Sequence, residues 1–134
     1  MKKQILAVDD SKAIRFLLQT VLGGDYQVVT VPDGYSAMYY LSNREQPDLI
    51  IVDPQLPDME NWELVEQLST SGMHGNVPVI VLSGLDRLET SSRCEELGVR
   101  KHFMKPFNPV ELLDDIRMLG LSGALDKDVT MLRF

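Results

Sequence analysis

Short apolar segments alternate with amphipathic segments along almost the whole chain, and this alternation limits the possible folds more than any other feature. Four of these segments are largely apolar, namely Ile5–Val8, Val28–Val31, Leu49–Val52 and Val77–Leu82, and Val99–Met104 is the last predicted strand. Strands that are apolar along their whole length are buried on both faces, which is typical of a parallel sheet covered by helices on either side. The alternation therefore predicts β-α units repeated five times.

The segments between the apolar runs carry helix start and stop signals. After Ser11, apolar residues recur at the spacing of a helix with one buried face. They are Ile14, Leu17, Leu18, Val21 and Leu22. Asp33 and Asn108 are predicted N-caps of later helices. Gly98 is predicted to end a helix that begins at Asp86, since a glycine often follows the last helical residue.

Right-handed connections between parallel strands leave few ways to arrange five such units. We predict a five-stranded, doubly wound α/β sheet in the flavodoxin-like order 2-1-3-4-5. The repeat ends near residue 119. We therefore predict one domain over residues 1–119 and a C-terminal tail, or the start of a linker, over residues 120–134.

Composition and charge exclude several classes of protein. The uninterrupted apolar runs, of which Leu49–Val52 is one, are all too short to cross a membrane, and no apolar segment of a secretion signal follows Met1. The net charge of −7 opposes direct binding to nucleic acid. The single cysteine, Cys94, cannot form an internal disulfide and is expected to be a half-buried helical thiol. A reducing compartment, and hence a cytoplasmic location, is the expectation.

Chemically useful side chains follow the predicted strands. Asp9 and Asp10 follow the first strand, Asp53 the third, Ser83 the fourth and Lys105 the fifth. In an open parallel sheet, ligands bind beyond the carboxyl ends of the strands, where these residues converge. The simpler alternative, in which Asp9 and Asp10 only cap the first helix, accounts for one carboxylate but not for the whole set.

Crowded carboxylates repel one another, and a hard cation relieves the repulsion. Mg²⁺ prefers oxygen ligands and is commonly held by one or two carboxylates together with phosphate oxygens. Beside such an ion, an aspartate can act as a nucleophile towards phosphorus and form an acyl phosphate. Ser83 and Lys105 suit the phosphoryl oxygens, through a hydrogen bond and through charge.

The chain resembles a response-regulator receiver domain of two-component signalling over residues 3 to 119. The motifs that carry the resemblance are the pair Asp9–Asp10, Asp53 with Pro57 four residues later, Ser83–Gly84, and the segment Gly98–Pro106. Each motif is weak alone, but their order and spacing are specific. The resemblance implies a phosphorylation-controlled switch.

The resemblance assigns a role to each matching residue. Asp53 would accept the phosphoryl group and ligate Mg²⁺. Asp10 would ligate the metal directly, Asp9 through a bound water, and the main-chain carbonyl of Gln55 would supply a further ligand.

The remaining matches lie on the fourth and fifth strands. Ser83 and Lys105 would bind the phosphoryl oxygens, and the Lys105–Pro106 bond would be cis. Ser83 would also act as a switch residue.

The departures from the family pattern are few. Asn61 stands where the family usually has glycine and is expected to keep the left-handed backbone turn. Pro54 directly follows Asp53 and is expected to stiffen the metal-binding loop. His102 stands at the position of an aromatic switch residue, as either a smaller switch or an exposed strand histidine. His74 is interpreted as a solvated loop residue rather than a metal ligand.

The resemblance also implies partners and limits the catalytic activity. The phosphoryl donor would be a phosphohistidine on a sensor histidine kinase or a phosphotransfer protein. A receiver catalyses only its own phosphorylation and dephosphorylation and is not an enzyme with a diffusing product. A homodimer through the fourth helix, fifth strand and fifth helix is compatible with the resemblance. We expect either a stand-alone receiver or the receiver part of a longer protein with its own output partner or domain.

Three alternative functions are weighed against this one. A pseudo-receiver would keep the fold as a protein-interaction module; Asn61 and His102 favour it, whereas the intact acidic and phosphate-binding residues oppose it. A flavin electron carrier needs a phosphate-binding loop rich in small residues after the first strand, where this chain has Asp9–Lys12. A haloacid-dehalogenase-type phosphatase needs Asp-x-Asp, where this chain has Asp53–Gln55.

Overall fold

The fold is a parallel sheet with helices on both faces, and its strand order is β2-β1-β3-β4-β5, as predicted. The computed structural model describes residues 2–43, 46–70 and 76–121. The strands are β1 (Gln4–Val8), β2 (Gln27–Val31), β3 (Leu49–Val52), β4 (Val79–Ser83) and β5 (Lys101–Met104). The helices are α1 (Lys12–Leu22), α2 (Gly34–Asn43), α3 (Glu63–Thr70), α4 (Arg87–Leu97) and α5 (Pro109–Met118).

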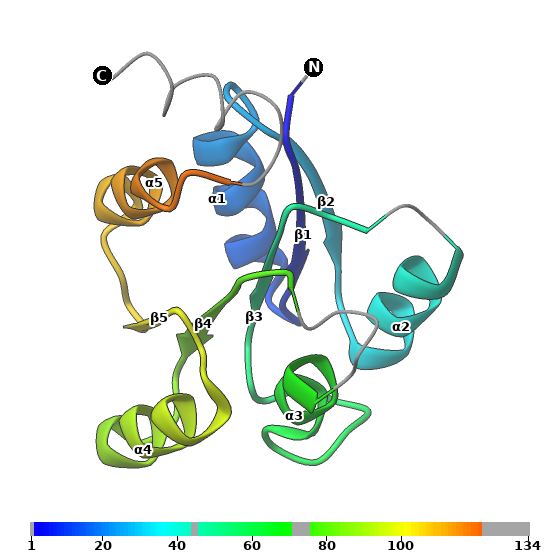
Figure 1. Ribbon diagram of the computed structural model, residues 1–134, viewed down its shortest axis with the longest axis vertical. Coiled ribbons are helices and arrows are strands. Elements are labelled where there is room, and N and C mark those ends of the chain that lie inside the picture. Colours follow the sequence, from blue (N-terminus) through cyan, green and yellow to red (C-terminus); the bar gives the residue numbers. More distant parts are fainter. Residues whose placement is uncertain (1, 44–45, 71–75, 122–134) are drawn as a thin grey trace.

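The central strands divide the apolar side chains between two cores. Alternate residues of a strand point to opposite faces of the sheet, so Ile50 and Val52 of β3 join one core and Leu49 and Ile51 join the other. Helices α2, α3 and α4 cover the first core, and α1 and α5 cover the second, as Figure 1 shows. A central strand such as β3 is therefore apolar along its whole length because both of its faces are buried.

The predicted helix caps are confirmed. Ser11 Oγ accepts a hydrogen bond from the N–H of Ile14 at 3.2 Å, and Asp33 Oδ1 accepts one from Ser36 at 2.7 Å. Asn108 caps α5. These side chains satisfy backbone donors that have no partner within their own helix.

Two predicted strand starts are wrong by two residues each. β4 begins at Val79 rather than Val77, because Pro78 has no N–H to donate to the ladder. β5 begins at Lys101 rather than Val99, because the Val99 N–H donates to the Cys94 carbonyl and closes the end of α4. Gly98 takes the left-handed conformation that this helix end requires, with φ of 72°.

The predicted tail lies largely outside the described residues, and so does His74. Leu121, the last described residue, is buried in the core beside α1 and α5. The boundary at residue 119 stays a prediction. None of the helices in the described ranges is long and apolar enough to cross a membrane.

The loop between β3 and α3 is fastened to α2 by a side chain that the sequence does not single out. Asp58 accepts hydrogen bonds from the N–H groups of Gly34 and Tyr35, both at 2.9 Å. Partial burial acts to raise the pKa of Asp58, but these two hydrogen bonds outweigh it, and the pKa lies below its usual range. Met59 packs so close to Gly34 that a Cβ at residue 34 would collide with the Met59 sulfur.

We predict that Asp58→Ala lowers the free energy of unfolding by about 1 kcal/mol at pH 7, the usual effect of losing a helix cap. Because the pKa is lower in the folded state, the contribution is complete above the unfolded-state value and is lost as pH falls through the folded-state value. Urea unfolding at several pH values measures this difference. Glu60→Ala, in the same loop, is the control, and an equal, pH-independent effect of both substitutions would contradict the prediction.

Candidate functional site

The carboxyl edge of the sheet brings together Asp9, Asp53 and Lys105, which each lie one residue beyond a strand. Main-chain hydrogen bonds extend the ladder to these residues: the N–H of Asp9 donates to Val31, that of Asp53 to Val8, and that of Lys105 to Ser83, at 2.7 to 3.1 Å. Rigid backbone therefore fixes the places from which the side chains project.

Lys105 bridges the two buried carboxylates. Its Nζ donates to Asp9 Oδ2 at 2.7 Å and to Asp53 Oδ2 at 2.8 Å. Asp9 and Asp53 are only 2% and 6% exposed. Two buried carboxylates side by side are costly, and the shared ammonium offsets much of that cost.

The other oxygens of these carboxylates are also engaged. Asp9 Oδ1 accepts from the N–H of Ser11 at 2.9 Å, and Asp53 Oδ1 accepts from the N–H of Gln55 at 2.8 Å. The Arg15 guanidinium donates to the Asp9 carbonyl at 2.9 Å. Each carboxylate is therefore held in one orientation before any ligand arrives.

The pKa values follow from burial and from this pairing. Burial raises the pKa of Asp53, against the opposing effect of the hydrogen bonds from Lys105 and from the Gln55 N–H. For Lys105, burial acts to lower the pKa, but hydrogen bonds to Asp53 and Asp9 outweigh it and raise the pKa. The ammonium therefore stays charged at neutral pH.

Asp10 completes an acidic cluster. Carboxylate oxygens of Asp9, Asp10 and Asp53 lie within 4.8 Å of one another. Asp10 is exposed, and its side chain makes no hydrogen bond or ion pair within residues 2–43, 46–70 and 76–121. Three carboxylates against one ammonium leave the cluster with an excess of two negative charges. An oxygen-only, negatively charged cluster with one free ligand suits a hard divalent cation.

Ser83 lies at the end of β4 but is turned towards α4. Its Oγ lies 2.8 Å from Thr90 Oγ1 and accepts from the N–H of Leu85 at 3.0 Å. In the described part of the chain, Ser83 makes no side-chain hydrogen bond to Asp53 or Lys105. The sequence predicts that Ser83 lies at the edge of the sheet, but it does not predict that Thr90 of α4 is its hydrogen-bond partner.

The loop that follows Asp53 is closed by Trp62. Its N–H donates to the carbonyl of Pro54 at 2.8 Å, and its indole Nε1 donates to Glu89 of α4 at 3.0 Å. The expected left-handed residue is Asn61, but Trp62 takes that conformation, with φ of 72°. This correction has a physical reason: the left-handed backbone costs about 1–2 kcal/mol for such a residue, and the buried, hydrogen-bonded indole offsets the cost.

The other expected positions are partly confirmed. The Lys105–Pro106 bond is cis, as expected. His102 is half-buried on β5 opposite Val81, and its role as a switch stays a prediction. Cys94 is fully buried rather than half-buried, and burial raises the pKa of its thiol to about 11.

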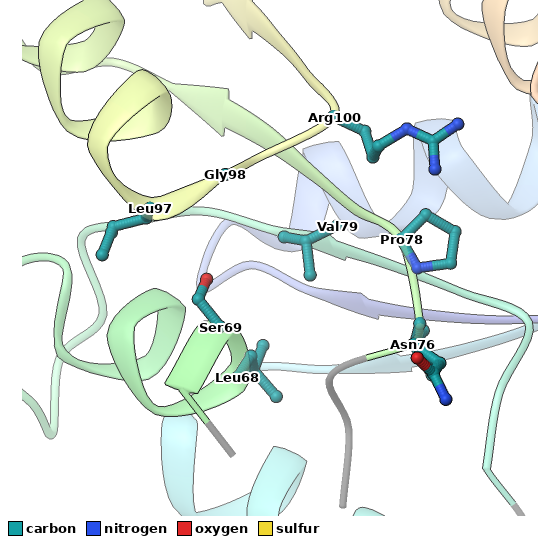
Figure 2. Close-up of a pocket in the computed structure, with 9 residues that line it drawn as sticks. Leu68, Ser69, Asn76, Pro78, Val79, Leu97, Gly98 and Arg100 are labelled. Atoms are coloured by element: carbon teal, nitrogen blue, oxygen red, sulfur yellow. The ribbon is translucent and has the colours of Figure 1, made fainter. Parts of the chain in front are cut away.

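A small pocket of about 130 Å³ lies at the opposite edge, where β4 and β5 begin. Figure 2 shows it between the end of α3, the segment before β4 and the end of α4, with Leu68, Val79 and Leu97 among its lining residues. It shares no residue with the acidic cluster. This pocket is therefore separate from the acidic cluster at the carboxyl edge.

Residues 5–117 match the family model of the response regulator receiver domain. The chain belongs to this family. The receiver is 31% identical over 118 residues to the sporulation initiation phosphotransferase F of Bacillus subtilis, covering 87% of this chain and 93% of that protein. It is 33% identical over 119 residues to a probable transcriptional regulator ycf27 of Galdieria sulphuraria, covering 87% of this chain but only 44% of that protein.

Solved structures agree with the family assignment. The phosphorylated cyanobacterial phytochrome response regulator RcpA is similar with a TM-score of 0.75 and 30% identity, over 89% of this chain and 91% of that one. The Mn²⁺-bound form of the response regulator Rcp1 is similar with a TM-score of 0.74 and 28% identity, over 87% and 91%. The receiver fold is therefore shared over most of each chain.

We predict that Asp10→Asn weakens Mg²⁺ binding about tenfold or more, because it removes the free carboxylate. Lys105→Ala removes the cation that neutralises Asp9 and Asp53, so it should leave Mg²⁺ affinity unchanged or raise it. Calorimetric titration measures both, and Trp62 fluorescence follows the loop.

Glu60→Gln, which removes one exposed charge from the Asp53 loop, is the matched control and should bind like the parent. Equal loss of affinity in the Asp10 and Lys105 variants would overturn this division of roles.

Proposed function

We propose that this receiver is a phosphorylation-controlled switch whose phosphoryl acceptor is Asp53, with Mg²⁺ as its cofactor. The observation that carries the proposal is the Asp53 carboxylate, held by Lys105 and the Gln55 N–H beside two further carboxylates. The family membership and the similarity to a phosphorylated and to a Mn²⁺-bound response regulator support it.

The proposed reaction transfers a phosphoryl group from a phosphohistidine of a sensor histidine kinase or phosphotransfer protein. An Asp53 oxygen attacks the phosphorus, the phosphorus–nitrogen bond breaks, and the leaving imidazole nitrogen keeps the bonding electrons and takes up a proton. Lys105 exchanges a carboxylate partner for a phosphoryl oxygen. The chain thus promotes its own modification and the later hydrolysis of the aspartyl phosphate, which regenerates the Asp53 carboxylate and releases inorganic phosphate; it converts no other substrate.

Asp9, Asp10, Asp53 and the Gln55 carbonyl are the proposed metal ligands. When bound, Mg²⁺ neutralises negative charge on the carboxylates and on the incoming phosphoryl oxygens. Asp10 would supply the free carboxylate, Asp9 would contact the ion through a water molecule, and Lys105 would limit the net charge of the site. A cytoplasmic location is proposed with this function, since it places the receiver with its phosphoryl donor.

The output of the switch stays a prediction. Ser83 and His102 are the proposed switch residues. Exposed apolar side chains occur on α4 and α5, namely Leu88, Val110 and Met118. They are compatible with the expected homodimer through α4, β5 and α5, and equilibrium sedimentation with and without phosphorylation measures that association.

We predict that acetyl phosphate and Mg²⁺ add one phosphoryl group to the intact chain. The adduct should be absent in Asp53→Asn and after chelation of the metal. Intact-mass measurement reads the adduct directly, and Glu60→Gln is the control that should be modified like the parent. An undiminished adduct in Asp53→Asn would refute the assignment. A pseudo-receiver, by contrast, would take no adduct in any variant.

A further inference from the structure

The hydroxyl groups of Ser83 and Thr90 form a pair that is closed off from solvent. Their oxygens lie 2.8 Å apart, and both residues are 0% exposed. Ser83 is the last residue of β4, at the carboxyl edge, and Thr90 lies in the first turns of α4. The pair therefore joins the proposed phosphate-binding hydroxyl directly to a helix.

One of the two hydroxyl protons of the Ser83–Thr90 pair has no acceptor. Two hydroxyls carry two donor protons, and the bond between them uses only one. The remaining partner of the pair, the Leu85 N–H, is itself a donor. No other hydrogen bond reaches either hydroxyl from residues 2–43, 46–70 or 76–121. A buried donor without an acceptor is costly, and a phosphoryl group offers only acceptor oxygens.

Helix α4 depends strongly on this contact. The buried residues of α4 are Thr90 and Cys94, and most of the helix surface is polar. Cys94 and the partly buried Leu97 are the apolar side chains that α4 adds to the first core. Two further links are polar: Glu89 accepts from Trp62, and Arg93 pairs with Glu66 of α3 at 2.7 Å. With little apolar burial, a change in one buried hydrogen bond alters how firmly the helix is held.

We propose that Thr90 is a positioning residue for phosphoryl binding, an inference that rests on the function proposed above. In the phosphorylated chain, Thr90 donates to Ser83, and Ser83 donates its own proton to a phosphoryl oxygen. This chain gives both protons an acceptor, and each bond polarises and strengthens the next. Phosphorylation at Asp53 thereby tightens the attachment of α4.

Beryllofluoride with Mg²⁺, a mimic of the phosphoryl group, tests the first half of the proposal. Thr90→Val, which keeps the shape but removes the hydroxyl, should weaken beryllofluoride binding about three- to tenfold. Thr90→Ser should restore parental affinity. In a Ser83→Ala background, Thr90→Val should have almost no further effect, since the Thr90 hydroxyl then has nothing to orient. Thr20→Val, on the far face of the sheet, is the matched control.

The single cysteine can report whether phosphorylation tightens the attachment of α4. Cys94 is buried in α4, and a disulfide reagent such as dithionitrobenzoate reaches it only when the helix opens. Beryllofluoride should slow Cys94 labelling severalfold in the parent, in Thr90→Ser and in Thr20→Val. At saturating beryllofluoride, labelling of Thr90→Val and of Ser83→Ala should remain at the rate of the ligand-free variant. A role of Thr90 in stability alone would change the basal rate but not this response.

The possible outcomes test the role of Thr90, the link to α4 and the proposed function separately. If Thr90→Val binds beryllofluoride as tightly as the parent and keeps the slowed labelling, Thr90 has no positioning role. If that variant does not fold, a beryllofluoride response that persists in Ser83→Ala overturns the relay equally. A parent that binds beryllofluoride without any change at Cys94 overturns the link to α4. If the parent takes neither beryllofluoride nor a phosphoryl group, the proposed function itself is wrong, and this inference falls with it.

Discussion

The ammonium of Lys105, shared between Asp9 and Asp53, is the interaction on which the rest of the site depends. Parallel strands bring their carboxyl ends to one edge, and the hydrogen-bonded ladder holds these residues there. Without a cation between them, two buried carboxylates at that edge would repel each other. Lys105 does not neutralise the site, because Asp9 and Asp53 already carry one negative charge more than its ammonium offsets, and Asp10 adds another.

Side-chain hydrogen bonds connect the carboxyl edge of the sheet to helices α2 and α4. Asp58 fastens the loop after Asp53 to α2, and Trp62 fastens the same loop to α4 through Glu89. The Ser83–Thr90 pair makes a second connection to α4 from the end of β4. Asp53 therefore lies near two polar contacts of α4, the Trp62–Glu89 and Ser83–Thr90 hydrogen bonds. Helix α4 itself buries little apolar surface. This arrangement is the physical basis for proposing that α4 responds to phosphorylation.

The sequence predicted the strand order and the converging residues because both depend on periodic patterns and on the ends of buried strands. Two strand starts are predicted wrongly, because the missing N–H of Pro78 and the hydrogen bond from the Val99 N–H to the end of α4 are local effects that the residue pattern does not show. The left-handed residue is Trp62 rather than Asn61, because burial of the indole outweighs backbone preference. Thr90 could not be predicted, since its significance comes from a partner on another element.

The central claim is that Asp53, and not a neighbouring carboxylate, carries the phosphoryl group. Borohydride reduces an aspartyl phosphate to homoserine, which marks the modified residue permanently. After phosphorylation by acetyl phosphate, reduction and proteolysis, peptide mass spectrometry should find homoserine at residue 53 alone. Homoserine at residue 9 or 10, or no homoserine in a chain whose mass shows the adduct, would contradict the claim.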